Sequence, residues 1–265
     1  MHLFAGTYFG GGVFRSTDHG DTWSDKNDGL IETDVRAIAI NASNALSAGT
    51  YGIGMFRSTD GGQAWQETNS GLSALYESCL AINAAGNQFD RRDFCWNCCQ
   101  EGVYRSTDNG DSWTLANTGL TSTDIAGLGI NNNGHIFAGT RSIMGEGGGM
   151  FRSTDNGDSW TEQNNGFTAF DANAVTFNSA GYVFAAAAGG VFRSINGGGI
   201  WTNISSGLIP VDGNVWALAV DSGDYAYAGT AGGGVFRTTR STALRGLPKQ
   251  RPRPTPALRP LSPRR

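Results

Sequence analysis

The chain has 265 residues, enough for one large domain, with 40 glycines, 39% hydrophobic residues and 16% charged residues. The hydrophobic residues occur in short runs, far below the ~20 consecutive apolar residues of a membrane-spanning helix, which excludes such a helix. Glycine-rich turns between short Val, Ile, Phe and Thr runs predict an all-β fold. The net charge of −4 combines an acidic body with a basic C-terminal tail.

The chain begins with a strand-like run, Met1–Thr7, and lacks the basic start and apolar stretch of a secretory signal peptide. Taken alone, this start indicates either a cytoplasmic protein or a missing N-terminus. The register of the internal repeats decides between these two interpretations.

A short run of residues returns along the chain: Val13–Asp18, Met55–Asp60, Val103–Asp108, Met150–Asp155, a weakened copy at Val191–Asn196 and a partial copy at Val235–Thr238. The steps between successive copies are 42, 48, 47, 41 and 44 residues. A period of ~40–50 residues with several strands per unit is typical of the blades of a β-propeller.

One unit is predicted to hold four strands, at Asp124–Asn131, His135–Thr140, Gly149–Asp155 and Ser159–Gln163. A single four-stranded blade cannot bury both of its faces, so blades must stack around an axis. We therefore predict an all-β propeller of four-stranded antiparallel blades over residues 1–239. Four full and two partial blades make six in all and 22 strands, with an incomplete propeller as the alternative.

The hairpin between the third and fourth strands carries the motif Ser-x-Asp-x-Gly-x-x-Trp. The copies are Ser16, Asp18, Gly20 and Trp23; Ser58, Asp60, Gly62 and Trp65; Ser106, Asp108, Gly110 and Trp113; Ser153, Asp155, Gly157 and Trp160; and Ser194, Asn196, Gly198 and Trp201. Asp can accept hydrogen bonds from its own turn, Gly supplies a positive φ and Trp supplies a large apolar face. This chemistry predicts a structural role, without a metal ion, because the spacing does not fit an EF-hand loop.

The motif resembles the Asp-box, or BNR, repeat at all four fixed positions. Proteins with such repeats include sialidases, xyloglucan-degrading glycosidases, sortilin-type receptors, the photosystem II assembly factor and proteins labelled two-component-regulator propellers. The resemblance implies a propeller located outside the cell or in the periplasm. It does not fix an activity, since function depends on sites added to the fold.

Three of the four cysteines interrupt the third unit at Cys95–Cys99, where a second strand is expected. One interpretation is a zinc or redox site, but a second pair of ligands at suitable spacing is missing. The alternative is a local frameshift, because the codons allowed for Phe94–Cys98, read one base later, permit Phe-Ala-Gly-Thr. We favour the frameshift.

The tail, residues 240–265, contains six of the seven prolines and eight basic residues counting from Arg240. It is predicted to be a disordered basic segment. A nucleic-acid or membrane arm is one interpretation; an altered reading frame is favoured, because the tail replaces an Asp-box within a blade. Since residues 2–27 and 214–239 overlap as partial blades, we predict a monomeric domain that is a fragment of a longer protein.

The face opposite the Asp-box turns carries the candidate ligand-binding residues. Acidic residues stand near the start of each inner strand and are joined by residues of the loops between second and third strands: Asp34, Glu77, Asp124, Asp171, Asp212, Tyr8, Tyr51 and Arg141. This ring could bind a sugar, a cation or a basic peptide. Its regular recurrence equally fits residues that cap turns, because catalytic residues break the symmetry of a repeat.

A sialidase site needs three arginines to clamp a carboxylate. Outside the repeated Phe-Arg-Ser step and the tail only Arg36, Arg91, Arg92 and Arg141 remain, which disfavours a sialidase. We predict a non-catalytic scaffold that binds a protein or a glycan and needs no cofactor. The alternative is a truncated or degenerate glycoside hydrolase, sialidase-like or xyloglucanase-like, with two carboxylates that break the symmetry.

Overall fold

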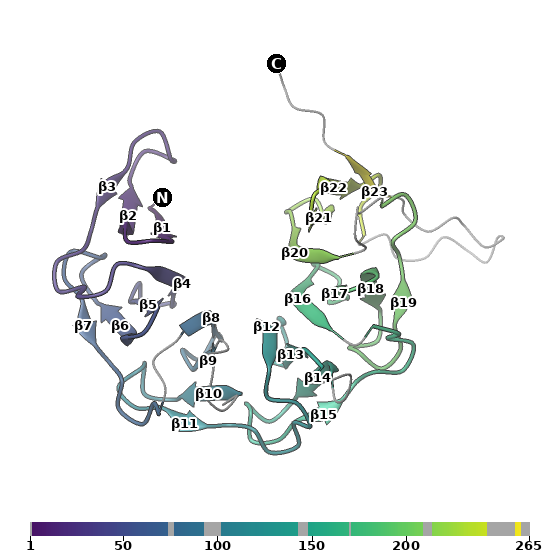
Figure 1. The fold of residues 1–265 in the computed structure, drawn as a ribbon, viewed down its shortest axis with the longest axis horizontal. Helices are drawn as coiled ribbons and strands as arrows, with labels where there is room; N and C mark the ends of the chain where they lie inside the picture. Colours follow the sequence, from purple (N-terminus) through teal and green to yellow (C-terminus); the bar gives the residue numbers. More distant parts are fainter. Residues whose placement is uncertain are drawn as a thin grey trace. The chain divides into compact units, whose positions relative to one another are not determined.

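The structure is a computed structural model that describes residues 2–73, 77–92, 102–142, 148–169, 171–208, 214–242 and 258–260. All regular structure in these residues is β-strand, arranged in six antiparallel sheets. Figure 1 shows the strands of each sheet side by side in their order along the chain. The predicted all-β propeller with four-stranded antiparallel blades is confirmed. No helix in the described residues is long and apolar enough to cross a membrane.

We number the sheets as blades 1 to 6. Blade 1 contains β1 (Leu3–Thr7), β2 (Gly12–Ser16) and β3 (Ser24–Asp25). Blade 2 contains β4 (Val35–Ile40), β5 (Leu46–Thr50), β6 (Gly54–Ser58) and β7 (Gln66–Glu67). Blade 3 contains β8 (Glu77–Ile82), β9 (Gln88–Arg92), β10 (Val103–Ser106) and β11 (Thr114–Leu115).

Blade 4 contains β12 (Ile125–Ile130), β13 (Ile136–Thr140), β14 (Gly149–Ser153) and β15 (Thr161–Glu162). Blade 5 contains β16 (Ala172–Phe177), β17 (Val183–Ala187), β18 (Gly190–Ser194) and β19 (Thr202–Asn203). Blade 6 contains β20 (Val215–Val220), β21 (Ala226–Thr230), β22 (Gly234–Thr238) and β23 (Leu258–Pro260).

The chain divides into two compact units, and each is described by itself. Unit 1 comprises residues 1–118, 123–130 and 157–159, and unit 2 comprises residues 119–122, 131–156 and 160–265.

The sixth sheet differs from the predicted partial blade. Leu258–Pro260, within the tail predicted to be disordered, pair as β23 with β22 and complete four strands. Thr242, just before the undescribed part of the tail, is buried and donates its hydroxyl to the Asp224 carbonyl oxygen at 2.7 Å. Tail residues 243–257 and 261–265, and the segment Cys95–Cys99, lie outside the described residues.

The Asp-box turns are held by their own Ser and Asp side chains. In the first copy the Gly20 N–H donates to Ser16 Oγ at 2.8 Å, and Ser16 Oγ donates to Asp18 Oδ1 at 2.7 Å. Asp18 Oδ1 also accepts the Thr22 N–H at 3.0 Å. The glycine of each copy has a φ between 85° and 100°, the left-handed region that glycine adopts without steric cost.

These hydrogen bonds stabilise the ionised carboxylates. Donation by Thr22 and Ser16 lowers the pKa of Asp18 from 3.8 to about 2. The Ala64 N–H and the Ser58 hydroxyl likewise lower the pKa of Asp60. The charges on Asp18 and Asp60 therefore contribute to the stability of their turns.

Asp-box tryptophans such as Trp65 and Trp201 also connect their blades to the preceding ones. Trp65 Nε1 donates to the Lys26 carbonyl oxygen at 2.8 Å, and the Trp65 N–H donates to the Asp28 carbonyl oxygen at 2.9 Å. Both acceptors belong to the crossing segment between blades 1 and 2. The same pair of bonds recurs in unit 2, where Trp201 Nε1 donates to Gln163 at 2.7 Å and its N–H donates to Asn165 at 2.9 Å.

Close approach at this junction requires glycine in the crossing segment. A Cβ at Gly29 would collide with the Trp65 carbonyl oxygen, and one at Gly166 would collide with the Trp201 carbonyl oxygen. Contact with the tryptophan of the following blade thus explains the glycine of the Asn-x-Gly crossings, at Gly29, Gly71, Gly119 and Gly166.

The repeated arginine adds a second link between neighbouring blades. Arg15 Nη1 in β2 donates to the Gly61 carbonyl oxygen at 3.0 Å, in the Asp-box turn of blade 2. Arg152 Nη1 in β14 donates to Gly197 in the turn of blade 5 at 2.7 Å. This contact accounts for Arg15 and Arg152 in their third strands.

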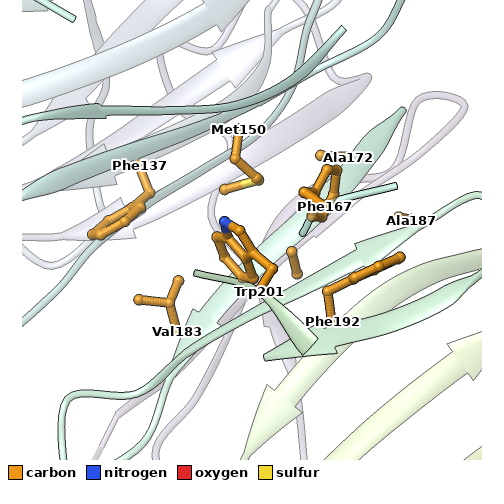
Figure 2. Packing of buried hydrophobic residues seen from close by; sticks show 9 residues of the cluster. Phe137, Met150, Phe167, Ala172, Val183, Ala187, Phe192 and Trp201 are labelled. Carbon is orange, nitrogen blue, oxygen red and sulfur yellow. The ribbon is translucent and has the colours of Figure 1, made fainter. Parts of the chain in front are cut away.

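Figure 2 shows the core that these links enclose in unit 2: Trp201 lies among Phe137 and Met150 of blade 4 and Val183 and Phe192 of blade 5. Trp201 is 3% exposed, whereas Trp23, which has no preceding blade in the described chain, is 44% exposed. Tryptophan burial therefore comes from the junction between two blades.

Replacing Gly166 by Ala should destabilise the protein more than replacing Gly181 by Ala. Both glycines have nearly the same positive φ, +79° and +77°, so both variants carry the ~1–2 kcal/mol cost of a left-handed alanine. Only Gly166 faces a neighbouring backbone, which adds ~1–3 kcal/mol of steric cost. Urea unfolding of the two variants measures the difference, and equal destabilisation would contradict the proposed role of the junction.

Acid should weaken the fold through the Asp-box carboxylates. The folded-state pKa values of Asp18 and Asp60 lie below the unfolded value of ~3.9, so the stabilisation is complete above that pH and is lost as pH falls through the lowered pKa values, about 2 for Asp18. Asp18→Asn should flatten this dependence while keeping the turn, because Asn196 accepts the Ser194 hydroxyl and the Ile200 N–H in its own copy. The measurement is the free energy of unfolding in urea between pH 2 and pH 5. If this free energy depends on pH equally in Asp18→Asn and in the unmodified protein, the Asp18 carboxylate does not stabilise the fold.

Candidate functional site

The loops between second and third strands meet the start of the inner strands at one end of the sheets. The Tyr51 N–H, just after β5, donates to the Asp34 carbonyl oxygen, just before β4, at 3.0 Å. In unit 2 the Ala188 N–H makes the same bond to the Asp171 carbonyl oxygen at 3.3 Å. These contacts bring together the two loop sets that the sequence assigned to the ligand-binding face.

Inner strands carry a β-bulge at their second residue. The register shifts between the first and third residues of β4, β8, β16 and β20, which leaves Arg36, Ser78, Asn173 and Trp216 outside the regular pairing. A bulge redirects a side chain and is frequent beside functional sites. The residue type at the bulge differs in all four strands, whereas the neighbouring strands repeat nearly the same sequence. The bulge is therefore a position at which one blade can differ from the next.

In unit 1 the bulge residue Arg36 lies at the centre of a cluster that we define as Tyr8, Asp34, Arg36 and Tyr51. The Arg36 guanidinium carbon lies 3.7 Å from the ring centroid of Tyr8 and 4.4 Å from that of Tyr51. Arg36 Nε donates to Asp34 Oδ1 at 2.7 Å and Nη2 donates to Asp34 Oδ2 at 3.0 Å. The guanidinium is therefore stacked between two rings and fixed along one edge by a carboxylate.

This cluster is partly withdrawn from solvent at its charged centre. The side chains of Arg36 and Asp34 are 15% and 13% exposed. The hydrogen bond from Arg36 to Asp34, together with the charge of that carboxylate, raises the pKa of Arg36, so the arginine remains charged. The ion pair orients the guanidinium, and both tyrosine rings lie against it.

The aromatic rim of the cluster is open to solvent. Tyr8 and Tyr51 are 54% and 48% exposed, and the neighbouring Phe9 is 87% exposed. The rings of Tyr8 and Phe9 meet edge to face with their centroids 4.3 Å apart. Two exposed tyrosine rings on one fixed arginine, with Phe9 beside Tyr8, form a surface suited to contact with a ligand.

Unit 2 has a looser arrangement at its own end of the sheets. Asp171 Oδ1 accepts the Ser142 N–H at 2.8 Å and the Ser142 hydroxyl at 3.2 Å. The Arg141 guanidinium carbon lies 5.9 Å from the ring centroid of Trp216, which is 51% exposed. The positions are reversed relative to unit 1: here the arginine lies in a loop and the aromatic side chain belongs to the bulge residue.

The structure brings only part of the predicted ring together. Tyr8, Asp34 and Tyr51 meet through Arg36, and Asp171 lies beside the loop that begins with Arg141. Asp124 precedes β12 as predicted, whereas Glu77 is itself the first residue of β8. The side chain of Glu77 and all of Asp212 lie outside the described residues.

Sequence reasoning missed Phe9 and Trp216 and left Arg36 outside the site. Two signals pointed to them: Arg36 is one of the few arginines outside the repeated step and the tail, and Trp216 lies outside every Asp-box. Among the described residues no group of three or more His, Cys, Asp and Glu side chains could hold a metal ion.

Several solved structures share this fold. YCF48 bound to D1 peptide superposes with a TM-score of 0.68 at 14% identity, covering 97% of this chain and 77% of that one. The GH74 xyloglucanase from Xanthomonas campestris gives 0.70 at 18% identity, covering 97% of this chain and 45% of that one. PorZ, a surface component of the type-IX secretion system of Porphyromonas gingivalis, gives 0.68 at 16% identity, with coverage of 91% and 38%.

The chain thus spans less than half the length of the xyloglucanase and of PorZ. At these identities the likeness concerns the fold. No curated protein gives a significant match to the chain.

The repeats, the turn geometry and these structures define the chain as a β-propeller of the Asp-box, or BNR, type. Residues 11–146, about half of the chain, match the family model Sortilin-Vps10, described as sortilin, neurotensin receptor 3. The chain belongs to this family.

Proposed function

We propose that the protein is a non-catalytic scaffold that binds a protein or a glycan through the end of the sheets that carries the bulges. The observation that carries this proposal is the stacking of Arg36 between Tyr8 and Tyr51, with Asp34 fixing the guanidinium. A preorganised aromatic surface loses little side-chain entropy when a ligand binds.

The composition of the cluster supports binding. Tyrosine and arginine are enriched among the residues that contribute most to interface affinity, and aromatic rings offer large contact areas. In this cluster of unit 1, exposed aromatic rings and a charged side chain meet away from the turns and junctions that the repeat explains. A flat partner such as a sugar ring or a peptide side chain could stack on the outer faces of the rings.

The related folds support both ligand classes. One similar structure, YCF48, is bound to a peptide, and another, the GH74 enzyme, is a xyloglucanase. These properties belong to those proteins, and for this chain they suggest which ligands to test first.

The alternative function, a glycoside hydrolase, is favoured by the likeness to GH74 enzymes. Such an enzyme requires two free carboxyl groups on the same face. Asp34 is held in two hydrogen bonds by Arg36, and Asp171 in two by Ser142. Either residue would have to leave these partners to act as acid or nucleophile, which makes binding the better-supported function.

A printed array of glycans and peptides tests the proposal. The unmodified protein should bind a subset of the array, and the double variant Tyr8→Ala/Tyr51→Ala should lose at least about tenfold in affinity. The matched control Ile195→Ala/Ile200→Ala removes two exposed side chains, 63% and 56% exposed, from an Asp-box turn and should bind normally. Absence of binding by the unmodified protein, or equal loss in both variants, would contradict it.

The hydrolase alternative has its own readout. Incubation with xyloglucan or with sialylated oligosaccharides, followed by detection of new reducing ends, would reveal cleavage. Cleavage that disappears in Asp34→Asn would replace the scaffold proposal by the enzyme.

A further inference from the structure

The Arg36 guanidinium has a donor that its ion pair does not use. Its Nε and Nη2 donate to the two carboxylate oxygens of Asp34, at 2.7 Å and 3.0 Å. Nη1 makes no hydrogen bond with the described part of the chain, yet it is not one of the buried unpaired atoms, in contrast to Arg152 Nε. Nη1 is therefore a hydrogen-bond donor that reaches solvent.

The Asp34 carboxylate supplies acceptors beside this donor. Each of its oxygens accepts one hydrogen bond from Arg36, whereas an ionised carboxylate offers about four lone-pair sites in all. The Asp34 side chain is 13% exposed, so the carboxylate is not sealed from solvent. Because the two-point ion pair fixes both groups edge to edge, the cluster presents a donor and an acceptor side by side in a constant geometry.

Tyrosine rings flank this polar edge. The guanidinium carbon of Arg36 lies 3.7 Å from the ring centroid of Tyr8 and 4.4 Å from that of Tyr51. Tyr51 belongs to a blade with four strands and is still 48% exposed. A ligand that reaches Arg36 Nη1 therefore meets an aromatic surface together with the donor and the acceptor.

The charge balance of the cluster disfavours an anionic ligand. Asp34 neutralises Arg36, and a further carboxylate adjoins the pair, since Glu32 Oε1 accepts the Asp34 N–H at 2.7 Å. Among the described side chains here, two carboxylates stand against one guanidinium. A carboxylate brought by a ligand would meet like charge, which costs binding free energy.

Blade 5 shows that the fold does not require an arginine at this bulge. Its bulge residue is Asn173, whose Nδ2 donates to the Val215 carbonyl oxygen at 3.0 Å. The acidic residue before that strand, Asp171, is held by Ser142 without an arginine. The arginine of blade 2 thus adds a group that the repeat does not need for its own pairing.

We propose that the ligand of the Arg36 cluster is a neutral sugar ring with two equatorial hydroxyl groups on neighbouring carbons. Such a ligand presupposes the proposed function and selects one of its two ligand classes. One hydroxyl oxygen accepts a hydrogen bond from Arg36 Nη1, and the neighbouring hydroxyl donates to an Asp34 oxygen. Equatorial hydroxyls leave C–H groups on the face of the sugar, and this face packs on a tyrosine ring.

Two simple glycosides test the proposal because they share the equatorial hydroxyls and differ by one carboxylate: methyl β-D-glucopyranoside and methyl β-D-glucopyranosiduronate. Saturation-transfer NMR with the full chain should show saturable binding of the neutral sugar in the millimolar range, with transfer to its ring C–H protons. The uronate should bind at least about tenfold more weakly. Equal or tighter binding of the uronate would overturn the proposal.

Matched charge variants locate this selectivity. Glu32→Gln keeps an acceptor oxygen for the Asp34 N–H and should narrow the difference between the two glycosides, because it removes the adjoining carboxylate. Glu67→Gln removes a carboxylate from the exposed outer strand β7 of the same blade and should leave the difference unchanged. An equal effect of both variants would contradict the charge argument.

Arg36→Asn gives blade 2 the bulge residue that blade 5 already carries, so the fold should persist, which a cooperative urea transition checks. Affinity for the neutral sugar should fall at least about tenfold. Unchanged affinity, or no binding of the neutral sugar by the unmodified protein, would overturn the proposal. Binding of an array peptide that is lost in Tyr8→Ala/Tyr51→Ala would then leave the proposed function in place, whereas absence of any binding would contradict both.

Discussion

The contact between the tryptophan of one blade and the crossing segment before it is the constraint on which the other features of this fold depend. At Trp65 and Trp201 the indole and the backbone N–H both donate to carbonyl groups of the preceding crossing segment. The crossing glycine lets these two backbones approach, and the Ser-Asp hydrogen bonds shape the turn that carries the tryptophan. One short motif thus defines both the hairpin within a blade and the junction between blades.

This constraint separates structural residues from candidates for function. The arginine of the third strand serves the same junction, since Arg15 and Arg152 donate to the turns of the following blades. What varies is the opposite end of the sheets, where a bulge in four inner strands sets one side chain free of the regular pairing. Because the bulge residue takes no part in the core, its side chain can change from blade to blade and form a binding site while the core stays intact.

The strands and Asp-box turns could be predicted from the sequence because they recur in every blade with nearly the same residues. In blade 4 the second and third strands, expected at His135–Thr140 and Gly149–Asp155, form at Ile136–Thr140 and Gly149–Ser153. The candidate site was predicted only in part. Stacking of Tyr8 on Arg36 joins residues of two blades, and a β-bulge leaves no mark in an alternating pattern, so the central arginine was not assigned to the site. The strand β23 could not be predicted either, because the proline-rich tail has no alternating pattern.

Hydrogen exchange of the indole protons tests the central role of the junction most directly. Trp201 Nε1 bonds to the preceding blade, whereas Trp23 Nε1 bonds to Gly20 of its own turn and its side chain is largely exposed. If the junction holds the blades together, the Trp201 proton should exchange only through global unfolding, about a thousandfold or more slower than the Trp23 proton. Exchange at similar rates would show that the blades separate readily and would contradict this account.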